Sequence, residues 1–119
     1  MPLTEAEYGN RVPVDGYGPG FFRVGGAVHR GPVIVTPDGV QPWAGLDDRA
    51  ALMALADRVD LLFLGMGADI AHPPQGLAEA LDDAGVRVEA MSTPSAARTY
   101  NVLLSEDRSV ACALLPVAG

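Results

Sequence analysis

The sequence predicts a single α/β domain of three layers, with a mixed, partly parallel sheet, about three helices and an N-terminal glycine-rich β-hairpin region. Two observations lead to this fold class. The front third of the chain is rich in glycine and carries only short β-type runs, whereas the back two thirds alternate strand and helix patterns. Helices that cross over between strands of one sheet are typical of α/β folds.

Length, charge and composition narrow the classes of protein. With 119 residues, of which 49% are hydrophobic, the chain fits one compact domain, which we expect over 14–119. The polar residues 1–13 have no apolar period and predict a flexible N-terminal arm. The formal charge is -7 and the basic residues, all arginines, are scattered along the chain, so the sequence predicts no nucleic-acid partner.

Targeting signals and cysteine usage indicate the compartment. Cys112 is the only cysteine, so an intrachain disulfide cannot form, and its apolar surroundings predict a buried thiol. The first residues show no signal pattern, and no apolar run approaches the roughly twenty residues of a membrane span. We therefore expect a cytoplasmic protein without stable membrane insertion, present as a monomer or small homo-oligomer.

The glycine-rich region predicts four short strands. They cover 21–24, 27–30, 33–36 and 40–43. Gly25-Gly26 between the first two is typical of a β-hairpin, and Pro37-Asp38-Gly39 is typical of a tight turn. The GxxxxGK[ST] motif of phosphate-binding loops does not occur, so we interpret these glycines as turn residues.

Helix and strand patterns then alternate to the end of the chain. Asp47 or Asp48 can cap a first helix, and Trp43 just before it is either a core residue or an anchor at an interface. The continuous apolar run 61–64 predicts the central strand. The remaining elements are a helix near 75–84, a strand over 86–91, a helix from 94 and a strand over 109–115.

The helix from 94 has the clearest start. Thr93 is the expected N-cap and Pro94 the first helical residue, where the missing N–H of proline costs nothing. The apolar stripe that should face the sheet consists of Ala96, Ala97, Tyr100, Leu103 and Leu104.

A candidate ligand cleft lies where this helix begins. If strands 61–64 and 86–91 are adjacent and parallel, the loop Gly65-Met66-Gly67 meets the helix start, with Thr93 and Ser95, at one edge of the sheet. The free backbone amides at a helix start can bind an anion, and Arg98 lies one turn further along the helix. The alternative is that the glycines only relieve crowding against the helix. The loop lacks the third glycine of a dinucleotide fingerprint, so we expect no cofactor.

Catalytic and metal-binding sets are not evident. Neither His29 nor His72 has a ligand at recognisable metal spacing, so we expect no metal. Asp69 and His72 could form an acid–base pair that approaches a serine across the cleft, or be solvated loop residues. The residues alone therefore predict no particular enzymatic activity.

Several motifs together resemble a known family. They are Tyr17-Gly18-Pro19-Gly20-Phe21-Phe22-Arg23-Val24 with Gly26, Pro37-Asp38-Gly39 with Trp43, Leu64-Gly65-Met66-Gly67, and the block Met91 to Asn101 with Glu106 and Arg108. This pattern resembles the small domain family that includes the mitochondrial NADH dehydrogenase complex I assembly factor 3 and the Mth-type bacterial and archaeal proteins. Met66 departs from the family, which usually carries Gly-Thr-Gly in this loop.

The resemblance implies both a fold and a function. The fold it implies is a three-layer α/β arrangement with an added β portion. The mitochondrial members have no accepted catalytic activity and bind other assembly factors and nascent subunits, so the resemblance implies a non-enzymatic protein whose partners are other proteins, in the biogenesis of respiratory or membrane complexes. The alternative is a small anionic ligand binder or weak enzyme that uses the cleft.

Overall fold

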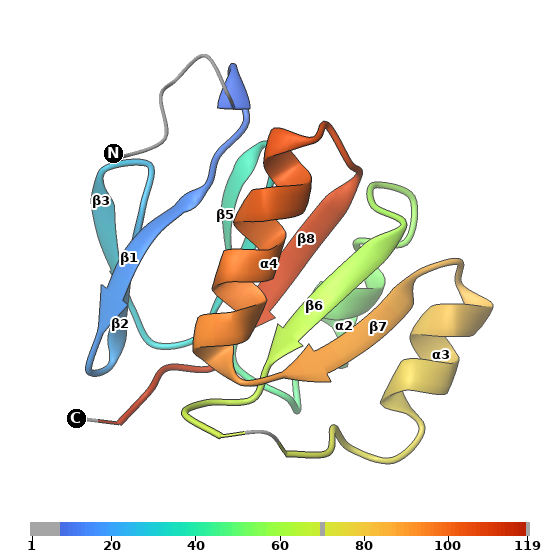
Figure 1. Ribbon diagram of the computed structural model, residues 1–119. Coiled ribbons are helices and arrows are strands. Elements are labelled where there is room, and N and C mark those ends of the chain that lie inside the picture. Colours follow the sequence, from blue (N-terminus) through green and yellow to red (C-terminus); the bar gives the residue numbers. More distant parts are fainter. Residues whose placement is uncertain (1–7, 70, 119) are drawn as a thin grey trace.

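The computed structural model describes residues 8–69 and 71–118, and they form two β-sheets (Figure 1). The smaller sheet is antiparallel in the order β1-β2-β3, with strands β1 (Val14–Gly18), β2 (Phe21–Val24) and β3 (Ala27–Arg30). The larger sheet has the order β5-β4-β8-β6-β7. Its strands are β4 (Val33–Thr36), β5 (Gly39–Pro42), β6 (Leu61–Gly65), β7 (Arg87–Met91) and β8 (Val110–Leu114).

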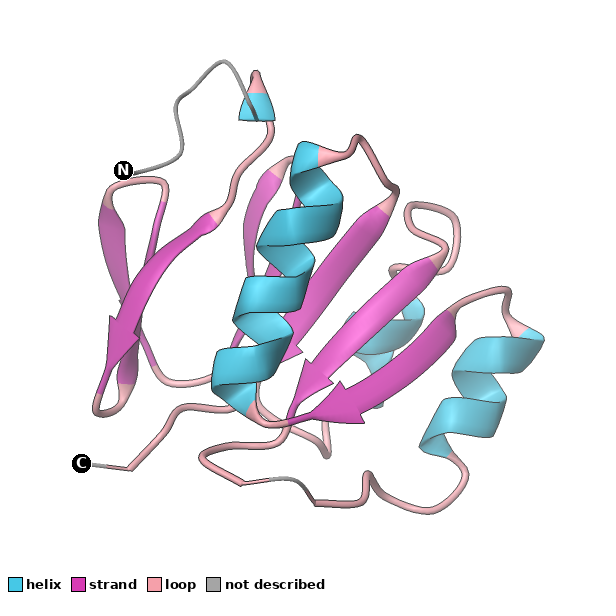
Figure 2. Ribbon diagram, in the orientation of Figure 1, coloured by secondary structure: helices cyan, strands magenta, loops and turns pink. Residues whose placement is uncertain are grey.

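The predicted fold class is confirmed. Helix α4 (Thr93–Ser105) lies on one face of the larger sheet, and α2 (Arg49–Met53) lies behind the sheet (Figures 1 and 2). Helix α3 (Leu77–Asp83) shares a core with α2. The sheet is mixed because β6 runs parallel to β7 and β8, whereas β4 runs antiparallel to β5 and β8.

The two faces of the sheet belong to two separate cores. In β8, Val110, Cys112 and Leu114 point to the α4 side, where they pack with Tyr100 and Leu104. The intervening residues of β8 pack on the other side with the leucines of α2 and α3. This alternation is the two-residue period of a strand buried on both faces.

The order of the strands corrects one prediction. Strand β6, which we expected at the centre of the sheet, is an interior strand, and β8 occupies the middle position. The chain passes from the edge strand β7 through α4 and over β6, so β8 is added on the far side of β6. Both strands are continuously apolar, so hydrophobicity alone does not distinguish their places.

The segment before β1 also differs from expectation. Residues 1–7 of the expected flexible arm lie outside the described residues. Within the rest of that arm, Tyr8 is buried and Arg11 donates to the Leu104 carbonyl at 2.6 Å, while Val12 accepts from the Tyr100 hydroxyl at 2.7 Å. Residues 8–13 are therefore packed against α4. These contacts are made by single side chains, which leave no periodic signal in the sequence.

Candidate functional site

The loop after β6 and the start of α4 meet, as the sequence predicts, because β6 and β7 are adjacent and parallel. The Thr93 hydroxyl accepts from the Gly67 amide at 2.9 Å and donates to the Leu115 carbonyl at 2.6 Å. The Thr93 amide donates to the Gly67 carbonyl at 2.7 Å, and the Leu115 amide donates to the Gly65 carbonyl at 2.9 Å. We call this set of contacts the loop–helix junction.

Close packing explains the first glycine of the loop. A Cβ atom on Gly65 would lie 2.9 Å from the Cα and the Oγ1 of Thr93 and 2.9 Å from Leu114 Cδ2, which is too close for any side chain to fit without a shift of the helix. Gly67 has a φ of +101°, in the region that favours glycine. The glycines therefore allow backbone and helix to touch, which agrees with the crowding alternative.

The helix start corrects a second prediction. The N-cap of α4 is Ser92, whose side chain accepts from the Ser95 amide at 3.4 Å, and Pro94 is the second helical residue. Thr93 is the first helical residue and is completely buried. Its hydroxyl is used by the junction and is not available to cap the helix.

The junction leaves little for an anion to bind. The amides of Gly67, Thr93 and Ser95 all donate to protein oxygens. The amide of Met66 donates to the Met91 carbonyl, and the Met66 side chain packs against the core on the opposite face of the sheet. An anion at this point would have to compete with hydrogen bonds that the fold already makes.

Two other predicted site residues lie away from the junction. Trp43 is 4% exposed and donates its indole N–H to the Asp48 carbonyl at 3.3 Å, so its ring belongs to the core in this structure and not to the surface. Arg98 is exposed on α4 and lines a separate groove.

The remaining titratable candidates lie in the exposed loop after β6 and in the core. Asp69 and His72 are exposed residues of the loop, and no group of three or more metal-ligating side chains occurs within 8–69 and 71–118. Cys112 is fully buried, and burial raises the pKa of its thiol well above the ordinary value. Burial likewise raises the pKa of the Tyr100 hydroxyl. Both groups stay neutral at physiological pH.

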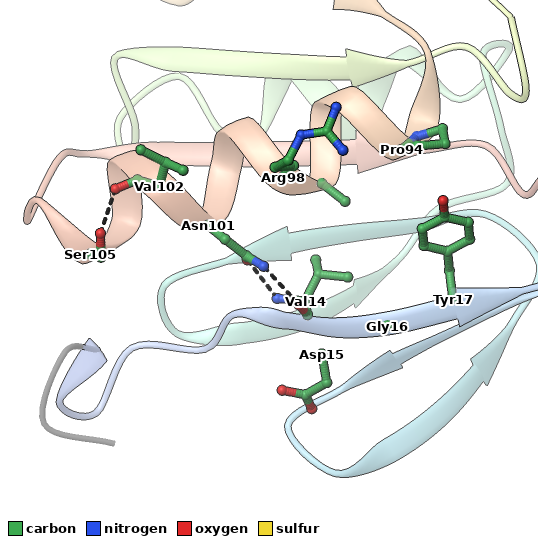
Figure 3. A pocket seen from close by; sticks show the side chains of 10 residues that line it. Val14, Asp15, Gly16, Tyr17, Pro94, Arg98, Asn101, Val102 and Ser105 are labelled. Atoms are coloured by element: carbon green, nitrogen blue, oxygen red, sulfur yellow. Dashed lines mark hydrogen bonds between the residues drawn. The ribbon is translucent and has the colours of Figure 1, made fainter. Parts of the chain in front are cut away.

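A groove of 370 Å³ lies between β1 and α4 (Figure 3). The strand side is the edge of the small sheet, and the helix side is the part of α4 that does not face the large sheet. The residues that line it include Val14, Tyr17, Pro94, Arg98, Asn101 and Val102. We call it the β1–α4 groove.

Asn101 fixes the floor of this groove. Its side-chain carbonyl accepts from the Val14 amide at 2.9 Å, and its side-chain NH₂ donates to the Val14 carbonyl at 2.8 Å (Figure 3). One amide side chain therefore pairs with a strand residue as a neighbouring strand would, and it satisfies both backbone groups of that residue.

The rim of the groove is apolar, with one cation. Tyr17 is 44% exposed and Val102 is 51% exposed, and both are large hydrophobic residues. Asp15 projects away from α4 and accepts from the Gly26 amide at 2.9 Å, whereas Arg98 projects in the opposite direction (Figure 3). Within the described part of the chain, Arg98 makes no ion pair.

Sequence reasoning found Arg98 but missed the groove. Strand β1 contains Gly16 and Gly18 and has no run of β-branched residues, so it gave no strand signal. The exposed Val102 on an otherwise polar helix face was the available clue, because an apolar residue outside the buried stripe serves no packing purpose within the domain.

The sequence model of the family described as "Protein of unknown function (DUF498/DUF598)" matches residues 14–115. The chain belongs to this family. An uncharacterised protein of Rhodobacter capsulatus is 59% identical over 100% of this chain and 96% of its own length. The NADH dehydrogenase [ubiquinone] 1 alpha subcomplex assembly factor 3 of Danio rerio is 31% identical, over 98% of this chain and 71% of the relative. The predicted family resemblance is thereby confirmed.

Solved structures share the fold. The crystal structure of an outer membrane protein from Bartonella henselae has a TM-score of 0.81 and 34% identity, over 92% of this chain and 98% of the other. A Bordetella pertussis protein described as a Mth938-like domain has a TM-score of 0.76 and 26% identity, over 98% and 90%. In the present protein, no helix among the described residues is long and apolar enough to span a membrane.

Proposed function

We propose that this protein is a non-enzymatic cytoplasmic protein that binds other proteins during the biogenesis of a respiratory or membrane complex. The observation that carries the proposal is the relationship to assembly factor 3 of NADH dehydrogenase, which extends over 98% of this chain. The relationship extends along the whole domain and is not limited to one motif. It therefore favours a function that the whole domain performs as a binding module.

The geometry supports protein binding better than the alternative, a small anionic ligand at the loop–helix junction. The amides of Gly67, Thr93 and Ser95 that would hold the anion already have protein acceptors. The β1–α4 groove, in contrast, exposes apolar side chains beside an arginine, and exposed apolar surface rimmed by polar groups is typical of protein-binding sites.

The proposal is tested by purification of the epitope-tagged protein from its own cells, followed by mass spectrometry. We expect subunits or assembly intermediates of a respiratory complex to be enriched over a tagged, unrelated protein of similar charge. A strain without the gene should assemble less of the same complex, measured as NADH dehydrogenase activity of its membranes. Normal activity together with no enrichment of such subunits would overturn the proposal.

The compartment needs a separate measurement, because the Bartonella henselae structure with 34% identity is described as an outer membrane protein. Cell fractionation with immunoblotting should recover this protein with the cytoplasmic marker. Recovery with the outer membrane after a high-salt wash would contradict the cytoplasmic assignment.

A further inference from the structure

We infer that the β1–α4 groove binds a short extended segment of a partner protein in which an apolar side chain lies two residues from an Asp or Glu. The inference rests on the proposed function, because it specifies the chemistry that a protein partner would present. Three features of the groove support it: its apolar rim, the charge beside the rim and the spacing between the two.

The apolar rim is the first of these features. Three large hydrophobic residues are clearly exposed in the described chain, namely Tyr17, Val28 and Val102, and two of the three line this one groove. The third, Val28, lies on β3 opposite Arg23 and not in the groove. The groove is thus where the domain offers apolar contact to another molecule.

The charge selects an acidic partner. Arg98 has no ion-pair partner in the described residues, although the chain carries an excess of acids and a net charge of -7. The first turn of α4 contains no acidic residue that would offset the positive end of its helix dipole. The cation and the helix dipole therefore add up on the N-terminal half of α4. Among the described residues, Asp15 is the one carboxylate that lines the groove, and it is held by the Gly26 amide on the side away from α4.

The spacing of the two features defines the segment. Arg98 and Val102 are four residues apart on one helix, so their Cβ atoms lie about 6 Å from each other. Side chains two residues apart on the same side of an extended segment are separated by about 6.6 Å. A carboxylate that pairs with Arg98 would therefore place the apolar side chain two residues away beside Val102, whereas the Tyr17 ring lies toward Pro94 at the other end of the groove (Figure 3).

The test uses NMR titration of the ¹⁵N-labelled protein with two peptides, acetyl-Gly-Leu-Ser-Glu-Gly-amide and its Glu-to-Gln counterpart. We expect the acidic peptide to shift the amide signals of residues along the groove, with saturation at millimolar concentrations. The Gln peptide should bind about two- to fivefold more weakly, because an exposed ion pair has this strength. The difference should disappear at high salt, since such a pair is screened within about 10 Å.

Matched variants separate the groove from the rest of the surface. Arg98→Glu should remove the preference for the acidic peptide, whereas Arg23→Glu, with the same charge change on the outer face of β2, should retain it. Val102→Glu should weaken binding at least tenfold, whereas Val28→Glu, at a valine of nearly equal exposure (50% against 51%), should bind like the parent protein. Equal effects within either pair, or signal shifts confined to other surfaces, would overturn the inference.

The same variants distinguish failure of the groove from failure of the function. If the tagged Val102→Glu protein still enriches respiratory subunits as the Val28→Glu protein does, the groove inference is wrong and the proposed function stands. If the parent protein enriches no such subunits while the peptide binds in the groove as described, the proposed function is wrong and the groove is a peptide site for a different class of partner.

Discussion

Thr93 is the residue on which the contact between α4 and the sheet depends. It is completely buried, and its hydroxyl joins the Gly67 amide to the Leu115 carbonyl. A hydroxyl that both accepts and donates satisfies two backbone groups that would otherwise be buried without partners. Its neighbour Ser92 has the simpler task of capping the helix. The Thr93 hydroxyl should therefore contribute more to the stability of the fold than the Ser92 hydroxyl does.

The first prediction compares these two residues. Thr93→Val preserves the shape of the side chain but leaves one donor and one acceptor unpaired, so it should lower the free energy of unfolding by about 2–4 kcal/mol. Ser92→Ala removes only a cap and should cost about 1 kcal/mol. Urea denaturation followed by circular dichroism measures both losses. Thr93→Ser, which retains the hydroxyl, is the control, and a Thr93→Val loss no larger than that of Ser92→Ala would contradict the role of the junction.

The exchange of roles between these two residues also shows what sequence could not supply. Proline is over-represented at the first helical position, which favoured Thr93 as the N-cap. The structure makes Thr93 helical and gives Ser92 the extended geometry of a cap, with φ of -64° and ψ of 154°. The decisive contact of Thr93 is with a carbonyl 22 residues away, and no local pattern contains that information.

Among the elements, β1 and α4 are linked by a side chain and not by the pairing of strands. Asn101 binds both backbone groups of Val14, and the small sheet is thereby held beside the helix. The hairpin of β2 and β3 was predictable because Gly25-Gly26 marks its turn. Strand β1 was not predictable, because its glycines give no strand signal. Its place is fixed by Asn101, and the sequence pattern shows only that this residue lies on a polar face of the helix.

The second prediction tests this link. Asn101→Asp keeps an acceptor for the Val14 amide but replaces the donor with a carboxylate that faces the Val14 carbonyl. It should therefore destabilise the protein by about 1–3 kcal/mol and should cost more than Asn101→Ala, which leaves room for water. Hydrogen exchange of the Val14 amide should accelerate in both variants. Ser105→Ala, on the same helix, is the control and should leave Val14 exchange unchanged; equal protection of Val14 in all three variants would contradict the link.

At the scale of the whole molecule, one sheet couples two cores. The radius of gyration, 13.1 Å, is close to the value of about 13.5 Å expected for one compact domain of this length. Strand β8 contributes Cys112 to the α4 core and Ala113 to the α2–α3 core, so neither core can be lost while the other keeps its central strand. The sequence predicted the three layers, because the strand and helix periods are local, but not the central position of β8.

The last prediction follows from this shared strand. Leu104→Ala opens a cavity in the α4 core and should lower the free energy of unfolding by about 2–5 kcal/mol. Trp43 lies in the opposite core and is the only tryptophan, so its fluorescence reports the far side of the sheet. Since the cores share β8, the fluorescence midpoint in urea should fall together with the midpoint from circular dichroism. Val102→Ala, at an exposed position of the same helix, should change the free energy of unfolding from either probe by no more than about 0.5 kcal/mol. A Trp43 transition that stays at the parent midpoint in the Leu104→Ala protein would show that the two cores unfold separately.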